Sequence, residues 1–90
     1  MYRKLVRHKG FKKDFSKVRF SDDAYSKYII YIGRLLSRES LPLEAKDHQL
    51  KGEWKDFREF HLSGDLLVIY RIEEDILELA RIGTHSQLFE

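Results

Sequence analysis

The pattern of hydrophobic residues in the first twenty positions has two parts, a short cluster followed by residues at helical spacing. Leu5 and Val6 are the apolar centre of a charged segment, residues 2–8, and predict a short strand that Gly10 ends. Beyond this glycine the apolar residues recur every three or four positions, at Phe11, Phe15 and Val18. Between them lie three lysines, Lys12, Lys13 and Lys17. We therefore predict a short amphipathic helix with a basic outer face.

A longer helix is expected to begin after Ser21. Serine is a favoured N-cap because its hydroxyl accepts a hydrogen bond from a backbone N–H of the first turn. Asp22 and Asp23 follow where the helix dipole stabilises carboxylates. The apolar residues then form a continuous stripe to about residue 38, namely Ala24, Tyr25, Tyr28, Ile29, Ile32, Leu35 and Leu36. Pro42 marks the exit into a loop.

The second half of the chain has the pattern of three strands joined by short turns. The segment 53–62 carries three aromatic residues, and the almost wholly apolar run 66–72 predicts a central strand covered on both faces. A third strand is expected at 76–82, and the links 63–65 and 73–75 are of hairpin length. The predicted order is one strand, two helices and a three-stranded antiparallel meander, with the helices on one side of the sheet.

Size and composition are those of a small globular protein, and residues 1–90 are predicted to form a single α+β domain. Hydrophobic residues make up 42% and charged residues 36%, which argues against disorder. The absence of cysteine excludes disulfides and thiolate metal sites and is compatible with a reducing cytoplasm, the expected location. No apolar run approaches the roughly 18 residues of a membrane span, and the basic N-terminus lacks the apolar core of a signal peptide.

Charge is unevenly distributed along the chain. Residues 1–40 contain 11 Lys or Arg and 4 Asp or Glu, a balance of +7, whereas residues 41–90 contain 6 and 11, a balance of −5. A basic half suits a polyanion or an acidic partner, and it equally suits a solvated, lysine-rich helix surface. A net charge of +2 does not by itself indicate nucleic-acid binding.

Strand direction predicts where the histidines of the second half gather. The first meander strand ends at His61, the second runs back, and the third returns to the same end with His85 just beyond it. Because neighbouring strands lie roughly 5 Å apart, we expect His61, His85 and Asp65 to share one end of the sheet. His48 lies in the preceding loop and is not placed by this argument. Phe89 follows His85 closely enough to cover the same end.

Two imidazoles and a carboxylate at one place suit general acid–base catalysis. Histidine titrates near neutral pH, so one ring can take the proton of a ribose 2′-hydroxyl while another protonates the leaving 5′-oxygen, without a metal. Arg58 and Arg81 are candidates to stabilise the charge of the transition state. An aromatic side chain would hold an unstacked base.

Other roles for these residues stay open. A histidine in a turn is usually an ordinary surface residue. An arginine in such a strand often forms only a structural ion pair, and the acidic residues available to Arg58 are Glu53, Asp56 and Glu59. A zinc or iron site would draw on His48, His61, Asp65 and His85, although no closely spaced histidine pair supports it.

Four motifs of the second half occur together. They are an LPL–KDH–LKG–W run over 41–54, an FRE-x-H-x-x-x-D stretch over 57–65, the LLVIY strand over 66–70, and R-x-G-T-H-x-x-L-F over 81–89. Residues 41–89 thereby resemble the YafQ branch of the RelE-like bacterial toxins. Residues 1–40 match this family only in pattern, as a strand followed by two basic amphipathic helices.

The resemblance implies a fold and an activity. The RelE-like fold is α+β, with two N-terminal helices packed on a small, twisted, mainly antiparallel sheet in the order β-α-α-β-β-β and a short C-terminal turn or helix. The activity would be that of a type II toxin, an endoribonuclease that cuts mRNA in the ribosomal A site without a metal or other cofactor. Its partners would be a cognate antitoxin similar to DinJ or RelB, the ribosome and mRNA, and no membrane.

The resemblance also implies a set of functional residues, His48, His61, Asp65, His85 and Phe89. We assign His85 as the general acid and either His48 or His61, the latter with Asp65 beside it, as the base. Phe89 is expected to contact substrate together with basic residues, namely Arg58, Arg81, Lys12 and Lys13.

The chain departs from the family at one position, and two other functions remain open. A well-known YafQ protein has tryptophan directly after the aspartate, where this chain has Leu66, so the codon preference is expected to differ. A ribonuclease of the same fold that acts on free RNA is the first alternative. The second is a non-catalytic RelE-fold binding protein, although the gyrase-targeting branch of that fold lacks this histidine set.

Overall fold

The computed structural model describes residues 1–89, which form a five-stranded mixed sheet with three α-helices. The strands, in chain order, are β1 (Lys4–Arg7), β2 (His48–Gln49), β3 (Arg58–His61), β4 (Leu66–Glu73) and β5 (Ile76–Thr84). The helices are α1 (Lys9–Phe15), α2 (Asp22–Leu36) and α3 (His85–Phe89), with 3-10 turns at Leu43–Ala45 and Gly52–Trp54. The predicted α+β class and element order are confirmed. No helix in the part described has the length and apolar character needed to cross a bilayer.

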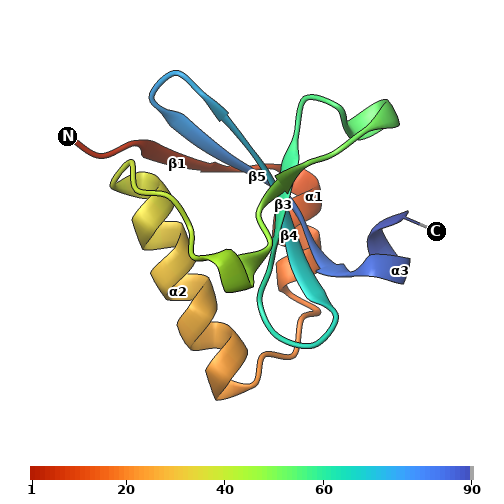
Figure 1. Ribbon diagram of the computed structural model, residues 1–90. Helices are drawn as coiled ribbons and strands as arrows, with labels where there is room; N and C mark the ends of the chain where they lie inside the picture. Colours follow the sequence, from red (N-terminus) through yellow and green to blue (C-terminus); the bar gives the residue numbers. More distant parts are fainter. Residues whose placement is uncertain (90) are drawn as a thin grey trace.

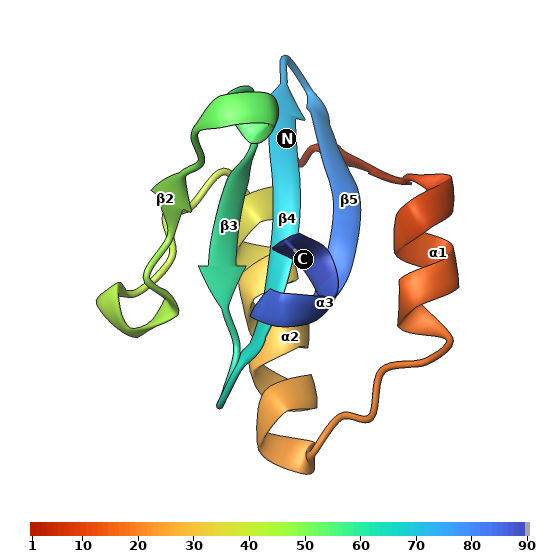
Figure 2. The same ribbon diagram turned by 90° about the vertical axis from the view of Figure 1, so that its right-hand side faces the viewer.

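Strand order in the sheet is β1-β5-β4-β3-β2. The three long strands form the predicted antiparallel meander, while β1 runs parallel to β5 at one edge and β2 pairs with β3 at the other. Helix α1 follows β1 and lies beside β5, as Figure 2 shows. The sheet thus places β4 at its centre, where the apolar run had predicted a strand covered on both faces.

Helix α2 begins where its capping signal predicts. The Ser21 hydroxyl accepts a hydrogen bond from the Ala24 backbone N–H at 3.1 Å, and Asp22 and Asp23 occupy the first turn. Helices α1 and α2 cover one face of the sheet, and α3 lies on the other face, so the sheet lies between two layers (Figures 1 and 2). The prediction that both N-terminal helices share one side is therefore confirmed.

The alternation of side chains along the strands divides the interior into two cores. The larger core lies under α1 and α2, and its innermost strand residues are Phe60, Val68, Tyr70, Leu77, Leu79 and Ile82. The smaller core lies on the α3 side and consists of Leu67, Ile69, Ala80 and Leu88, with partly buried Leu50, Trp54, Phe57 and Phe89 around it. The candidate site residues described below lie on this second face.

The predicted strand at 53–62 is wrong in its first half. Residues 52–54 form a 3-10 turn that begins at Gly52, whose φ is +66°, and only Arg58–His61 is extended. The aromatics at 54, 57 and 60 are spaced by three, so a strand with its period of two cannot place them on one face. Trp54 and Phe57 instead fold over the smaller core, and the Leu50 N–H donates to the Phe57 carbonyl at 3.0 Å to close the loop.

Candidate active site

Strand β3 presents two polar side chains to the face that carries α3. Glu59 and His61 are two residues apart and pair with Ile69 and Leu67, both members of the smaller core. His48 joins them because β2 places it directly opposite Glu59. Three residues from 48 to 61 therefore meet on one side of the sheet.

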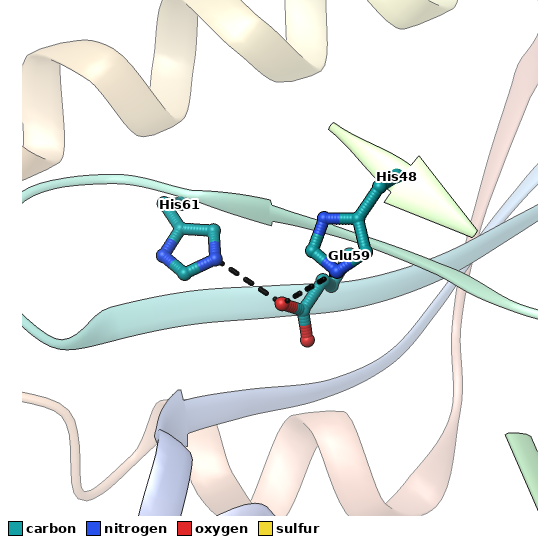
Figure 3. Close-up of side chains that lie close together, drawn as sticks. All are labelled: His48, Glu59 and His61. Carbon is teal, nitrogen blue, oxygen red and sulfur yellow. Dashed lines mark hydrogen bonds and ion pairs between the residues drawn. The ribbon is translucent and has the colours of Figure 1, made fainter. Parts of the chain in front are cut away.

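One carboxylate oxygen links the two histidines (Figure 3). Glu59 Oε2 lies 3.2 Å from His48 Nε2 and 3.1 Å from His61 Nε2, and the ring centroids are 6.3 Å apart. The Glu59 side chain is 6% exposed, whereas the His48 and His61 side chains are 52% and 31% exposed. A buried carboxylate thus lies beneath two accessible imidazoles, an arrangement that holds both rings in place.

The hydrogen-bond partners indicate where the protons lie. His48 Nδ1 is 2.7 Å from the Lys46 carbonyl, which can only accept, so this nitrogen carries a proton. If His48 Nε2 also donates to Glu59, the ring is an imidazolium. His61 binds Glu59 through Nε2 alone, and in the neutral ring donation from that atom leaves Nδ1 with a free lone pair. The two rings therefore differ in what they can do chemically.

A second group of polar side chains anchors the segment that carries His48. Asp47 Oδ1 accepts from the Tyr70 hydroxyl at 2.7 Å and from Arg58 Nε at 3.1 Å. Burial raises the pKa of Tyr70, and its hydrogen bond to Asp47 raises it further, so the phenol remains a donor. Arg58 therefore has a structural partner, but it is Asp47 and none of the three acidic residues named from the sequence.

Helix α3 fixes the position of His85. The Thr84 N–H donates to Gln87 Oε1 at 2.8 Å, and the Gln87 N–H donates to Thr84 Oγ1 at 3.3 Å, which together form a capping box. His85 is thus the first helical residue, and its side chain is exposed. The Phe89 ring lies one turn later with its centroid 4.9 Å from that of His85 and packs partly against the smaller core.

The strand register brings His61, Asp65 and His85 to the same end of the sheet, as predicted. His61 is the last residue of β3, Asp65 precedes β4, and Leu66 pairs with Thr84 just before His85. The Asp65 side chain, however, lines a groove toward the loop between α1 and α2. The carboxylate that binds His61 is Glu59, so the predicted pairing of His61 with Asp65 is not found.

The basic residues predicted to bind substrate lie in different settings. Lys12 and Lys13 are exposed on α1 and form no ion pair within residues 1–89. Arg81 binds Asp14 through two hydrogen bonds of 2.6 and 3.1 Å, which raise the pKa of its guanidinium. Arg81 therefore connects β5 to α1.

Glu59 was expected from the sequence only as an ion-pair partner of Arg58, whereas it lies between His48 and His61. The signal that could have found it is the strand period, because Glu59 and His61 are two residues apart and must share a face. His48 carried no comparable signal, since β2 is only two residues long.

The same cluster has the composition of a metal site. His48, Glu59 and His61 each offer one ligand atom, and these atoms lie within 4.8 Å of one another. Two imidazole nitrogens and a carboxylate oxygen are a ligand set that zinc accepts. This set differs from the metal alternative drawn from the sequence, because Glu59 replaces Asp65 and His85.

A family comparison shows to which proteins the chain is related. The sequence profile of YafQ, described as the bacterial toxin of a type II toxin–antitoxin system, matches residues 3–90. The chain belongs to the YafQ toxin family. A YafQ relative from Haemophilus influenzae is 47% identical over 66 residues, which are 69% of this chain and 65% of the relative. The mRNA interferase toxin YafQ of Escherichia coli K12 is 43% identical over 61 residues, 66% of each chain.

Solved YafQ structures share the fold. The toxin–antitoxin complex of DinJ and YafQ from Escherichia coli contains a chain that superposes with a TM-score of 0.83 at 30% identity, covering 100% of both chains. The alignments with the two curated relatives span just under two thirds of their lengths. The chain therefore has both the sequence profile and the fold of the YafQ toxins.

Proposed function

We propose that this protein is an endoribonuclease toxin that cuts mRNA in the ribosomal A site and is neutralised by a cognate antitoxin. The observation that carries the proposal is the pair of accessible imidazoles joined by the buried Glu59 carboxylate, at the end of the sheet from which His85 projects. The Escherichia coli relative is named an mRNA interferase toxin, which supports the same activity.

The proton positions support a division of roles among the three histidines. His61 Nδ1 would accept the proton of the ribose 2′-hydroxyl, because Glu59 holds the Nε2 proton. The freed 2′-oxygen attacks the adjacent phosphorus, and the bond from phosphorus to the 5′-oxygen breaks. His85 would donate a proton to that leaving oxygen. If its Nε2 carries a proton as well as its Nδ1, His48 would stabilise the additional negative charge on the phosphorane-like transition state.

Substrate contacts would surround this centre. Phe89 offers an aromatic face beside His85 on which an unstacked base can lie. Lys12 and Lys13 offer unpaired charge to the phosphates of mRNA or ribosomal RNA. Arg58 and Arg81 would act through their ion pairs with Asp47 and Asp14, which hold the segments beside the site.

The proposed protein partner is an antitoxin similar to DinJ. The solved DinJ–YafQ complex contains a toxin chain that this protein matches along its whole length. The basic balance of residues 1–40 suits an acidic antitoxin segment as well as RNA. An antitoxin that covers this surface would block access of RNA to the histidines.

The test is induction of the toxin in a bacterial host without the antitoxin, followed by mapping of mRNA 5′-ends. The wild type is compared with His85→Ala and with Ser86→Ala, a matched control at the next exposed position of α3. We expect growth arrest and codon-phased cuts for the wild type and Ser86→Ala, and neither for His85→Ala. Codon-phased cuts that persist in His85→Ala would contradict the assigned role, and cuts on naked transcript without phasing would favour a ribosome-independent nuclease.

Metal-assisted chemistry is the second candidate, favoured by the closeness of the His48, Glu59 and His61 ligand atoms. A zinc ion there would bind the same Nε2 atoms that donate to Glu59 in the acid–base proposal. Cleavage by purified protein therefore separates the two. Acid–base catalysis predicts full activity in a chelator and inhibition by added zinc, whereas a metal enzyme would lose activity in the chelator and regain it with zinc.

A further inference from the structure

A groove lies at the same end of the sheet as the histidines but on the α1 and α2 side. It encloses about 610 Å³ between the α1–α2 loop, the β3–β4 turn and the end of β5. This volume is within the range of about 300–1,000 Å³ that small-molecule sites occupy. Its lining includes Ser63, two residues after His61, and Thr84, directly before His85. The groove therefore adjoins the proposed centre without containing any of its histidines.

The lining separates into an apolar part and a polar part. Val18, Leu66 and Ile82 supply the apolar surface. Lys17 and Arg19 are exposed at the groove and form no ion pair within residues 1–89. The neighbouring Asp14 does not neutralise them, because its carboxylate accepts hydrogen bonds from Arg81 and from the Ile82 N–H. An apolar surface beside unpaired cations suits a flat ring that carries a phosphate.

Two further polar groups at the groove are free to read a base. The Asp65 carboxylate is exposed and makes no side-chain hydrogen bond in the described part of the chain, and Ser63 adds a hydroxyl. A carboxylate accepts from the amino group of cytosine, adenine or guanine. Uracil presents two carbonyl oxygens beside its single N–H, and these repel a carboxylate.

We propose that this groove binds a nucleotide of the RNA that flanks the scissile bond, with Lys17 and Arg19 on its phosphate and Asp65 on the edge of an amino-bearing base. The inference rests on the proposed ribonuclease function and extends it to substrate selection. It gives Asp65 a binding role, which leaves Glu59 as the carboxylate bound to His61. It also gives Leu66 a function, because the side chain forms part of the surface on which the base lies.

The test uses the full-length ¹⁵N-labelled protein and non-cleavable 2′-O-methyl trinucleotides of each of the four bases, followed by NMR. We expect the amides of Lys17, Arg19, Ser63 and Asp65 to shift together. The uridine trinucleotide should bind roughly fivefold or more weakly than the cytidine trinucleotide, which corresponds to the lower end of base discrimination by a side chain. Asp65→Asn should remove this preference.

Salt dependence tests the phosphate contacts. Lys17→Ala and Arg19→Ala should each reduce the slope of log Kd against log salt by about 0.7, the value for one phosphate contact to a single strand. The matched control is Lys4→Ala, an exposed lysine on β1 that lies outside the groove lining, which should leave the slope unchanged. An equal change in the control variant would overturn the assignment of the two cations to a phosphate.

Three other outcomes would overturn the proposal. The first is that amide chemical shifts change only on the face that carries His48, His61 and His85. The second is equal affinity for the trinucleotides of all four bases. The third is that inorganic phosphate alone changes the amide chemical shifts at the groove by the same amount. Mapping of mRNA cuts in cells distinguishes this inference from the proposed function. Cuts without groove binding would contradict the inference alone, whereas groove binding without cuts would contradict the ribonuclease proposal.

Discussion

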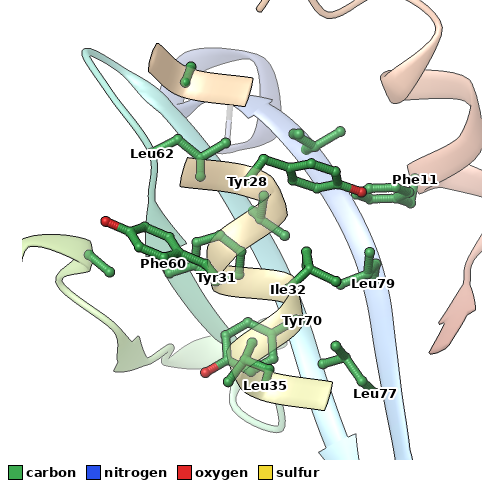
Figure 4. Close-up of a cluster of buried hydrophobic side chains, with 14 residues drawn as sticks. Phe11, Tyr28, Tyr31, Ile32, Leu35, Phe60, Leu62, Tyr70, Leu77 and Leu79 are labelled. Carbon is green, nitrogen blue, oxygen red and sulfur yellow. The ribbon is translucent and has the colours of Figure 1, made fainter. Parts of the chain in front are cut away.

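Tyr70 connects the larger core to the site, and replacing it with phenylalanine tests that connection. Tyr70 is 1% exposed and lies among the side chains of the core (Figure 4). Its hydroxyl donates to Asp47 Oδ1 at 2.7 Å. Asp47 directly precedes His48 in the chain. Tyr70→Phe removes the hydroxyl and leaves the shape of the ring unchanged, so its effects report on this single hydrogen bond.

The expected loss of stability follows from the acceptor. A hydrogen bond to a charged group contributes about 1.5–3 kcal/mol. Asp47 keeps its hydrogen bond from Arg58, so its carboxylate is not left unpaired and we expect about 1.5–2 kcal/mol, the lower part of that range. For a domain of this size each kcal/mol corresponds to about 4–8 °C, so the melting temperature should fall by roughly 6–16 °C.

Thermal unfolding followed by circular dichroism measures this change, with Tyr31→Phe as the matched control. Tyr31 is 3% exposed in the same core, and its hydroxyl has no hydrogen-bond partner in the described residues, so its removal should cost less than about 0.5 kcal/mol. If Asp47 also positions His48, Tyr70→Phe should lower kcat with little change in KM. A melting temperature within about 2 °C of that of Tyr31→Phe would refute the reasoning.

Three other predictions concern charge. A hydrogen bond from Arg71, and to a smaller extent one from His8, lowers the pKa of the Glu78 carboxyl. The contribution of Glu78 to stability is therefore present above about pH 4.3 and is lost as the pH falls through its folded-state pKa. In urea unfolding at pH 7 and pH 3, the wild type should lose more stability on acidification than Glu78→Gln, and equal losses would contradict this. Glu59→Gln should lower kcat by roughly 10²–10⁴-fold. Its stability should change little, because the neutral amide is less costly to bury than the carboxylate and this offsets its weaker hydrogen bonds. A kcat near that of the wild type would argue against the role of Glu59. Lys12→Glu with Lys13→Glu should weaken ribosome binding and reduce its salt dependence, which sedimentation at several salt concentrations would detect.

Local signals in the sequence were sufficient for the elements with a clear period or cap. The Ser21 cap, the apolar stripe after it and the continuous run at β4 each predicted what the structure contains. The expectation of a strand over residues 53–57 was wrong because the aromatics at 54, 57 and 60 are spaced by three, which does not fit the period of two of a strand. Gly52, with its positive φ, and the following 3-10 turn let Trp54 and Phe57 cover the smaller core.

The candidate site could be predicted only where strand direction determined it. Alternating strands placed His61 and His85 at one end of the sheet without knowledge of side-chain contacts. The approach of His48 depends on β2, a two-residue pairing that no periodicity indicates. The choice of Glu59 over Asp65 as the carboxylate partner of His61 depends on which side of the sheet end each side chain occupies, and this is set by tertiary packing.

The proposed mechanism has histidines move protons during attack of a 2′-hydroxyl on its own phosphodiester. The most direct measurement is the chemistry of the product ends, determined by mass spectrometry after cleavage of ribosome-bound mRNA by purified toxin. We expect a 2′,3′-cyclic phosphate on one fragment and a 5′-hydroxyl on the other, since the 2′-oxygen replaces the 5′-oxygen on phosphorus. A 3′-hydroxyl and a 5′-phosphate would mean that water is the nucleophile and would contradict it.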